Sequence, residues 1–572
     1  MSTPVAIVER DGTTPDLPDV NPLLRRVYGN RSIESADHLD RSLGKLASPT
    51  DLRQIDTAAR RIIEALRHRE NLLIIGDFDA DGATSVALAV SLLEAFGAKN
   101  VGYLVPNRFE FGYGLSPEIV EVALAEEPKV IVTVDNGVSS LAGVALANSH
   151  GIDVIITDHH LPGSELPDAH AIVNPNVPGC PFPSKVIAGV GVIYYVLSRV
   201  RAGLRECDWF AEQQIDEPNM ADWLDLVALG TVADVVPLDQ NNRVLVHQGL
   251  LRIRKGRCRP GIKALCEIAR RDLFNLQASD LGFALGPRLN AAGRLDDMRL
   301  GIKCLLAEDV TEARRLATAL DELNKARREL EQDMVADAEL IVRNHAIAVG
   351  DRYGITVYDP SWHQGVIGIV AGRLREKIHR PVVAFAEAGP HAPGELKGSA
   401  RSLSELHIRD VFDAVASRYP GLLEKFGGHA MAAGLSIKRI HYARFAKAFD
   451  QEVRNRLPAS ALSPRIETDG ELDASDLTLE TAALLDDAGP WGQGFPEPQF
   501  HGVFDLISQR VVGEHHLKLV LRYEGRLLDG IAFRQPPLGD VGRVKVVYRL
   551  QSNDYTGTPT LQLLVEHMQA LA

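Results

Sequence analysis

The stretch Asn71-Leu72-Leu73-Ile74-Ile75-Gly76-Asp77-Phe78-Asp79-Ala80-Asp81-Gly82 decides the fold class. Its first part, residues 71–75, has the continuous apolar character of a strand buried on both faces of a parallel sheet. Three acidic residues follow at once, so this strand ends in carboxylates. Residues 84–96 then place apolar side chains at helical spacing, which predicts a helix directly after the acidic cluster.

The same pattern occurs twice more along the chain. Residues 129–134 and 153–157 are expected strands, and they run into Asp135-Asn136-Gly137 and Asp158-His159-His160. A further acid, Asp234, follows an expected helix. Because the carboxyl ends of parallel strands meet at one edge of a sheet, we expect these polar side chains to converge there.

Convergent carboxylates repel one another unless positive charge lies between them, and metal ions supply that charge. Oxygen ligands suit Mg²⁺ or Mn²⁺, and added imidazoles favour Mn²⁺. Two such ions about 4 Å apart are a known arrangement for phosphoryl displacement. A calcium-binding loop is the alternative for the first cluster, but position 88, where its glutamate belongs, is Leu. Any one of these acids taken alone also fits a structural role, such as capping a helix.

The length of 572 residues predicts several domains. We expect an irregular N-terminal arm (1–50), a catalytic α/β domain (51–240), a helical region (241–345), a smaller α/β domain (346–455) and a β-rich domain (456–572). Residues 307–344 contain no Pro or Gly and predict one long connecting helix, or two helices with an unrecognised break. In the last domain, expected strands at 516–521, 543–548 and 561–565, with a turn at 554–557, suggest a small barrel.

Composition narrows the class of protein. The formal net charge of −14 argues against a protein that coats nucleic acid through bulk charge. The basic stretch 251–259 remains open, as a local groove or as a solvated face. The five cysteines form no C-x-x-C pair, which suits a reducing cytoplasm. No signal peptide is expected, because the N-terminus has no basic stretch followed by an apolar run. No membrane span is expected either, because no apolar run approaches ~18 residues.

Four ordered motifs carry a resemblance to the DHH phosphoesterase superfamily. They are Gly76-Asp77-Phe78-Asp79-Ala80-Asp81-Gly82-Ala83-Thr84-Ser85, Val134-Asp135-Asn136-Gly137, Asp158-His159-His160 and Gly230-Thr231-Val232-Ala233-Asp234. Residues 398–402 and 427–434 resemble the DHHA1 domain. Residues 286–294 and 106–115 resemble segments of the bacterial single-stranded-DNA exonucleases of this superfamily. The resemblance runs from about residue 20 to the end of the chain.

This resemblance implies a fold and a metal site. The fold is a parallel-sheet DHH domain, joined by a long helix to a smaller α/β DHHA1 domain and followed by an OB-type β-barrel. In the site, Asp79 would bind one divalent ion, Asp81 the other, and Asp135 both. His159 and Asp234 would complete the second position. Many relatives carry a histidine ligand where this chain has Ile75, so either Asp77 or water would take its place.

The resemblance also implies 5′→3′ hydrolysis of single-stranded DNA to 5′-mononucleotides, in DNA repair and recombination. Asp135 would serve the reaction, and His160 would contact the scissile phosphate or protonate the leaving oxygen. Arginine forks match phosphate oxygens. The expected substrate-binding residues are Arg108, Tyr113, Arg288, Asn290, His363, Ser399, Arg401, Gly428 and His429, with helix capping or packing as the alternative for His363.

Several further assignments depend on the same resemblance. The expected partners are single-stranded DNA with a 5′-phosphate, a RecQ-type helicase and a single-strand-binding protein, and the chain is expected to be a monomer. In the barrel, Phe500, Phe504, Tyr523, Phe533, Tyr548 and Tyr555 are available for stacking on bases, although several must be core. Trp491 either stacks on a base or anchors its loop. The glycines of residues 188–193 predict close helix packing rather than a dinucleotide site.

Three other functions compete with the exonuclease. A DHH/DHHA1 phosphodiesterase for short RNA or cyclic dinucleotides usually lacks the Arg288 segment and the terminal barrel. A family II pyrophosphatase has a different second domain. A non-catalytic single-strand-binding scaffold typically loses the metal acids, whereas Asp79, Asp81, Asp135 and Asp234 are all present here.

Overall fold

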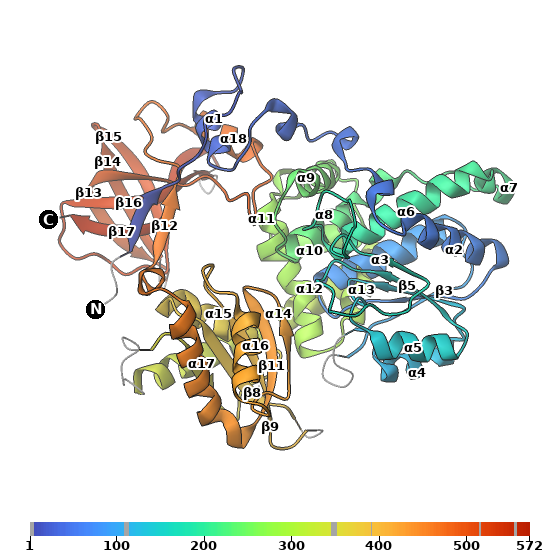
Figure 1. Cartoon of the computed structure of the whole chain (residues 1–572). Helices are drawn as coiled ribbons and strands as arrows, with labels where there is room; N and C mark the ends of the chain where they lie inside the picture. Colours follow the sequence, from blue (N-terminus) through green and yellow to red (C-terminus); the bar gives the residue numbers. More distant parts are fainter. Residues whose placement is uncertain are drawn as a thin grey trace. The chain divides into compact units, whose positions relative to one another are not determined.

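The computed structural model describes residues 5–107, 114–344, 352–389, 392–513, 516–553 and 557–571. The chain divides into two compact units (Figure 1). The larger unit comprises Glu9–Glu322 with Glu467–Ala572, and the smaller unit comprises Met1–Val8 with Leu323–Ile466. Each unit is considered by itself below.

Five parallel strands of the described residues form the central sheet of the larger unit, in the order β3-β2-β4-β5-β6. Their bounds are β2 Leu72–Ile75, β3 Val101–Leu104, β4 Val130–Val134, β5 Asp153–Thr157 and β6 Ala171–Val173. The strand order reverses at β2, because β3 and β4 lie on opposite sides of it. Parallel sheets bind ligands at such a point, beside the carboxyl ends of the strands. The predicted parallel sheet is confirmed.

Helices cover both faces of this sheet (Figure 1). One face carries α4 Pro117–Ala123 and α5 Leu141–Ser149, which share an apolar core with the sheet. The other carries α2 Ile55–His68, α3 Ala80–Ala95 and α6 Gly189–Glu206. Helix α3 begins at Ala80, earlier than predicted, because Asp79 caps its first turn.

A helical region follows in the same unit. Its elements are α7 Trp209–Gln213, α8 Leu224–Ala233, α9 Gln240–Arg254, α10 Pro260–Ile268, α11 Ala278–Asp280, a π-helical turn Leu281–Leu285, α12 Gly286–Leu295 and α13 Arg299–Leu306. The predicted connector is one unbroken helix, α14 Val310–Asn344. Part of the basic stretch 251–259 makes internal contacts, since Arg254 donates to the Leu276 carbonyl oxygen and Arg259 pairs with buried Asp225.

The smaller unit contains a five-stranded sheet in the order β10-β11-β9-β8-β7, in which only β7 and β8 run parallel among the pairs described. The strands are β7 Ile355–Tyr358, β8 Val382–Glu387, β9 Glu395–Arg401, β10 Lys425–Gly428 and β11 Ala432–Lys438. The helices are α15 Ile367–Ile378, α16 Ile408–Arg418 and α17 Tyr442–Arg456. Helix α15 packs on β8 and β9, while α16 and α17 enclose an apolar core with the sheet.

The predicted barrel is confirmed as a closed sheet, β13-β14-β15-β17-β16. Its strands are β13 Phe500–Val512, β14 His516–Tyr523, β15 Arg526–Phe533, β16 Arg543–Asn553 and β17 Thr560–Leu571, with α18 Leu479–Asp487 beside β16 and β17. Phe500, Phe504 and Tyr548 are core residues, whereas Phe533 is exposed. Tyr555 and most of the predicted turn lie outside the described residues.

The N-terminal arm is more ordered than predicted, and the expectation of an irregular segment is wrong for α1 Pro22–Gly29. Strand β1 Ala6–Glu9 also pairs with β12 Arg465–Thr468. Beyond α1, buried Arg31 donates two hydrogen bonds to buried Asp469, of 2.8 and 3.0 Å. This ion pair fixes the arm to the segment that leads into the barrel. None of the helices in the described ranges is both long and apolar enough to cross a membrane.

Candidate metal centre

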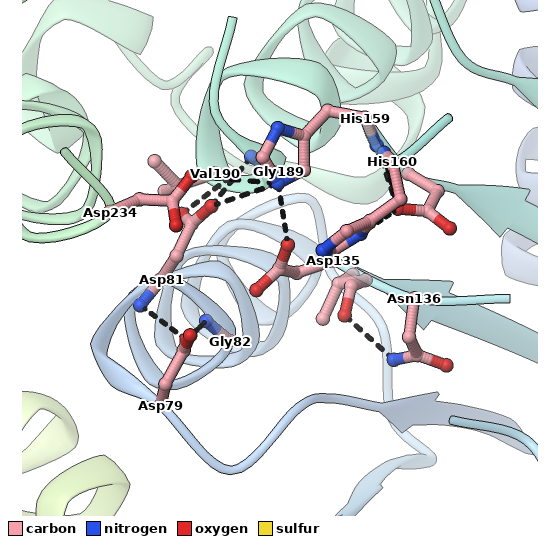
Figure 2. A network of polar contacts seen from close by, with 12 residues as sticks. Asp79, Asp81, Gly82, Asp135, Asn136, His159, His160, Gly189, Val190 and Asp234 are labelled. Carbon is pink, nitrogen blue, oxygen red and sulfur yellow. Dashed lines mark hydrogen bonds and ion pairs between the residues drawn. The ribbon is translucent and has the colours of Figure 1, made fainter. Parts of the chain in front are cut away.

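The acidic residues converge at the predicted edge of the sheet (Figure 2). Asp77 follows β2, Asp135 follows the adjacent β4, and His159 follows β5. Asp81 lies in the first turn of α3, and Asp234 is the C-terminal cap of α8. His159 Nε2 lies 3.1 Å from Asp135 Oδ1, 3.5 Å from Asp234 Oδ2 and 3.9 Å from Asp81 Oδ2.

Hydrogen bonds fix the loop between β2 and α3, which carries Asp79 and leads to Asp81. Asp79 Oδ1 accepts hydrogen bonds from the backbone N–H groups of Asp81 and Gly82, at 2.9 and 3.0 Å. The backbone N–H of Ala80 donates to Asn290 Oδ1 at 2.8 Å. Asn290, predicted to bind substrate, therefore supports the loop that carries Asp79 and Asp81.

Asp81 is oriented by the first residues of α6. Its carboxylate accepts hydrogen bonds from the N–H groups of Gly189 (2.7 Å) and Val190 (2.9 Å), as Figure 2 shows. A Cβ atom on Gly189 would lie 2.6 Å from the Cβ of Asp135, so a larger residue cannot occupy this position without displacing that acid. The prediction of close packing at residues 188–193 is confirmed, and the same packing shapes the site.

Asp158 orients both histidines that follow it. Its Oδ1 accepts from the backbone N–H groups of His159 (2.7 Å) and His160 (3.1 Å), and it lies 2.7 Å from His160 Nδ1. Burial opposes ionisation of Asp158, but the bonds with His160 outweigh it and lower its pKa to about 2. Burial likewise disfavours the charged imidazole, and Asp158 more than offsets this, raising the pKa of His160 to about 9.

Three carboxylates of the site have pKa values raised by burial and by neighbouring like charges. Burial and the neighbouring Asp79 raise the pKa of Asp81 to about 7. Burial and the surrounding acids also raise the pKa values of Asp135 and Asp234 well above their usual range. Nearby cations would relieve this repulsion, so the electrostatics of the site match the binding of divalent metal ions.

The donor atoms form compact sets suited to such ions. In each of three groups the candidate ligand atoms lie within 4.8 Å of one another: Asp77, Asp79 and Asp135; Asp81, His159 and Asp234; and Asp135, His159 and His160. Oxygen donors with one or two imidazoles fit Mn²⁺ or Mg²⁺. Ile75 is fully buried in the apolar core on the α4–α5 face. Asp77, not position 75, thus lies among the donors.

Arg288, a predicted phosphate ligand in the larger unit, makes its contacts within the protein. Arg288, on α12, is mostly buried and donates from Nε to Asp321 Oδ1 at 2.9 Å and from Nη1 to the Ala284 carbonyl oxygen at 2.6 Å. In this structure its guanidinium thus connects α12 to α14. Arg108 and Tyr113 lie outside the described residues.

The other predicted substrate residues belong to the smaller unit. Arg401, at the end of β9, donates to Ser399 Oγ at 3.3 Å, and both side chains face Gly368 in the first turn of α15. The sheet register places Ser399 opposite Gly434, which in turn lies opposite Gly427. Gly428 ends β10, and the next residue, His429, is exposed. His363 Nδ1 accepts a hydrogen bond from the Gly365 N–H at 3.1 Å, just before α15.

Sequence reasoning overlooked three groups that position the site. Asp158 was recognised as part of a motif, but its role in orienting the histidines was not identified. Asn174 and Asn176, after β6, donate through Nδ2 to the backbone carbonyl oxygens of His160 (2.9 Å) and His159 (2.7 Å). Their signal was available, because both asparagines follow the apolar run Ala171-Ile172-Val173 just as the acids follow theirs.

Fold and site together define a phosphoesterase of the DHH type. The DHH family, N-terminal domain, matches residues 71–231, the DHHA1 domain matches residues 350–455, and the RecJ OB domain matches residues 468–567. The resemblance seen in the four motifs is therefore confirmed.

The chain belongs to the RecJ family. It is 52% identical to the single-stranded-DNA-specific exonuclease RecJ of Dickeya dadantii (strain 3937), over 97% of each chain. It is 51% identical to that of Escherichia coli (strain K12), again over 97% of each chain. The crystal structure of RecJ from Thermus thermophilus in complex with Mn²⁺ is similar, with a TM-score of 0.80 and 28% identity over 97% of this chain and 76% of that one.

Proposed function

We propose that this chain hydrolyses single-stranded DNA from the 5′ end with two divalent metal ions, Mn²⁺ or Mg²⁺, and releases 5′-mononucleotides. The observation that carries the proposal is the pair of adjoining donor sets at the end of the parallel sheet. The chain belongs to a family whose curated relatives are named single-stranded-DNA-specific exonucleases, and this membership supports single-stranded DNA as the substrate.

We assign Asp77, Asp79 and Asp135 to one ion and Asp81, His159 and Asp234 to the other. The short contact between His159 Nε2 and Asp135 Oδ1, 3.1 Å, supports a role for Asp135 beside both positions. When bound, the ions would supply Lewis-acid activation of water and charge stabilisation at the phosphate. The chain's own contribution is to hold these donors close together before any substrate arrives.

His160 is the residue we assign to the reacting phosphate or the leaving 3′ oxygen. Its ring is held by Asp158 through Nδ1, so a single orientation is favoured. The carbonyl oxygen of the same residue is held by Asn174. A general acid needs such fixed geometry, because proton transfer works only within hydrogen-bonding reach.

We assign recognition of the terminal 5′-phosphate to Ser399, Arg401 and the glycine-rich strand ends at Gly428–His429. Burial and nearby Arg375 lower the pKa of Arg401, so this cation would gain from a bound anion. The exposed glycines at positions 427 and 434 leave the sheet surface beside Ser399 open. Arg108, Tyr113, Arg288 and His363 remain candidates for further phosphate contacts.

We assign to the barrel the binding of the single-stranded DNA that lies 3′ of the cleaved nucleotide. Exposed Phe533 and the edge-on ring of His516, 4.9 Å away between centroids, offer an aromatic surface on β14 and β15. Stacking on such a surface is tolerant of base identity. Action in the cytoplasm, as a monomer, alongside a helicase and a single-strand-binding protein in repair and recombination completes the proposal.

The test is digestion of single-stranded DNA labelled at the 5′ or the 3′ end, with Mn²⁺. We expect the 5′ label to appear at once in mononucleotide, while the 3′-labelled strand shortens gradually. Faster cleavage of dinucleotides or cyclic dinucleotides than of long DNA would favour the phosphodiesterase alternative. Binding of single strands without nucleotide release would favour the scaffold.

A further inference from the structure

A groove of about 400 Å³ lies in the larger unit, beside the end of α8. Its walls come from α8 and the residues after it, from the π-helical turn Leu281–Leu285, and from the loop that precedes the barrel. The apolar lining residues that matter here are Val232, Val235, Phe283, Trp491 and Pro496. This volume lies within the range of small-ligand sites, about 300–1,000 Å³.

One lining residue of the groove is the chain neighbour of a residue of the metal centre. Val235 lines the groove and directly follows Asp234, whose carboxylate lies 3.5 Å from His159 Nε2. Val235 has a φ of 60°, a left-handed conformation that is costly for a β-branched residue, and the residue is 62% exposed. An exposed apolar side chain is thus held in place by the backbone turn that also sets Asp234.

Another lining residue of the groove carries an aromatic ring. Phe283 is 80% exposed although it is a large apolar residue. Its π-helical turn packs tightly on α8, since a Cβ on Gly282 would lie 3.2 Å from Val232 Cγ1. Pro287, in the first turn of α12, cannot donate a backbone hydrogen bond to the preceding turn, which accounts for the π-helical geometry. The ring of Phe283 is therefore exposed, while the backbone of this residue is fixed by packing.

The third wall is also preorganised. Trp491 stacks on Phe495 with ring centroids 5.0 Å apart, and its Nε1 donates to the Leu485 carbonyl oxygen at 2.8 Å. The backbone N–H of Leu238 donates to the Gln493 carbonyl oxygen at 2.7 Å, which ties this loop to the chain beyond α8. Trp491 therefore anchors its loop while also lining the groove.

The charges of the groove disfavour a phosphate group. Asp486 and Glu497 contribute negative charge, and the arginine that lines it, Arg549, pairs with Glu497 and with Glu566. A phosphate placed here would face two acids and an arginine already neutralised. A flat, uncharged ring would instead bury apolar surface against Val235 and Phe283.

We infer that this groove binds a nucleobase of the strand whose phosphate lies at the metal centre, with the base against Phe283 and Val235. The inference rests on the proposed function and deepens it, because it locates a base-binding subsite next to Asp234. Its apolar walls do not distinguish one base edge from another, so binding there is tolerant of sequence.

The experiment combines a substitution with abasic DNA. Binding of 5′-phosphorylated 20-nucleotide single strands, each with one abasic position, is measured for the full chain and for Phe283→Ala, both carrying Asp135→Asn to prevent digestion. In the parent protein we expect one or two adjacent abasic positions to weaken binding by about tenfold, as for the loss of one stacked base. With Phe283→Ala, intact DNA should bind about tenfold more weakly. The same abasic positions should then weaken binding little further.

Phe274→Ala is the matched control, because Phe274 is also exposed, at 68%, and does not line the groove. It should leave the abasic profile unchanged. Penalties that add independently for Phe283→Ala and for every abasic position would overturn the inference. Failure of the proposed function is a separate result, since the unsubstituted chain would then release no nucleotide from single-stranded DNA.

Discussion

The metal centre of the larger unit and the surroundings of Arg401 and Arg375 in the smaller unit carry excess charge of opposite sign. In the first, buried acids crowd together and the pKa of Asp81 rises to about 7. In the second, burial and Arg375 lower the pKa of Arg401. Each region holds an excess of one charge that ordinary packing would avoid. This difference supports the proposed assignment of cations to the first region and of an anion to the second.

The largest effect is expected from Asp135→Ala, which removes the acid common to two donor sets. Nucleotide release should fall by about a thousandfold or more, because transition-state stabilisation by both ions depends on it. Steady-state release of labelled nucleotide measures the loss, and circular dichroism checks the fold. Asp19→Ala, an exposed acid in the same unit, should retain full activity. Retained activity in Asp135→Ala would refute the two-metal assignment.

Metal binding itself should appear as thermal stabilisation. Mn²⁺ at about a hundred times its Kd should stabilise the parent protein by about 2.7 kcal/mol. Asp81→Asn keeps a side-chain oxygen that can accept from Gly189 or Val190 but removes the negative charge. We expect this variant to lose most of the Mn²⁺-dependent rise in Tm. An equal rise in both proteins would place the ions elsewhere.

The anion side of the comparison is tested by Arg401→Ala. Hydrogen bonds to charged groups contribute about 1.5–3 kcal/mol, so the preference for a 5′-phosphate over a 5′-hydroxyl end should fall by about tenfold or more. The ratio of kcat/KM values for the two substrates measures this. Arg409→Ala, on α16 of the same unit, is the matched control and should leave the ratio unchanged. If Arg401→Ala also left it unchanged, the terminal phosphate would have to bind elsewhere.

A smaller effect should follow Asn290→Ala. This change removes the acceptor for the Ala80 N–H and leaves every proposed metal ligand in place. Residues that support metal ligands typically change metal affinity by about 10–100-fold, and we expect the lower end because Asp79 still caps the loop. The Mn²⁺ concentration for half-maximal activity should rise, and excess Mn²⁺ should restore kcat. A lower kcat at an unchanged Mn²⁺ requirement would show a direct role in the reaction.

Local patterns in the sequence determined much of this protein. Apolar runs that end in Asp77, Asp135 and Asp158 predicted parallel strands, and the geometry of such sheets predicted that these ends meet. The absence of Pro and Gly predicted the long helix α14, and the series of expected strands after residue 456 predicted the barrel. These features depend on periodicity and chain direction, which neighbouring residues encode.

The tertiary structure alone decided which distant side chains meet. Arg288 is engaged by Asp321, Asn290 holds Ala80, and Gly189 lies against Asp135. The barrel aromatics likewise divided into core and surface only once the sheet closed, leaving Phe533 outside. The physical reason is that such contacts depend on packing angles and on the direction of each side chain, which the spacing of residues along one strand or helix does not specify.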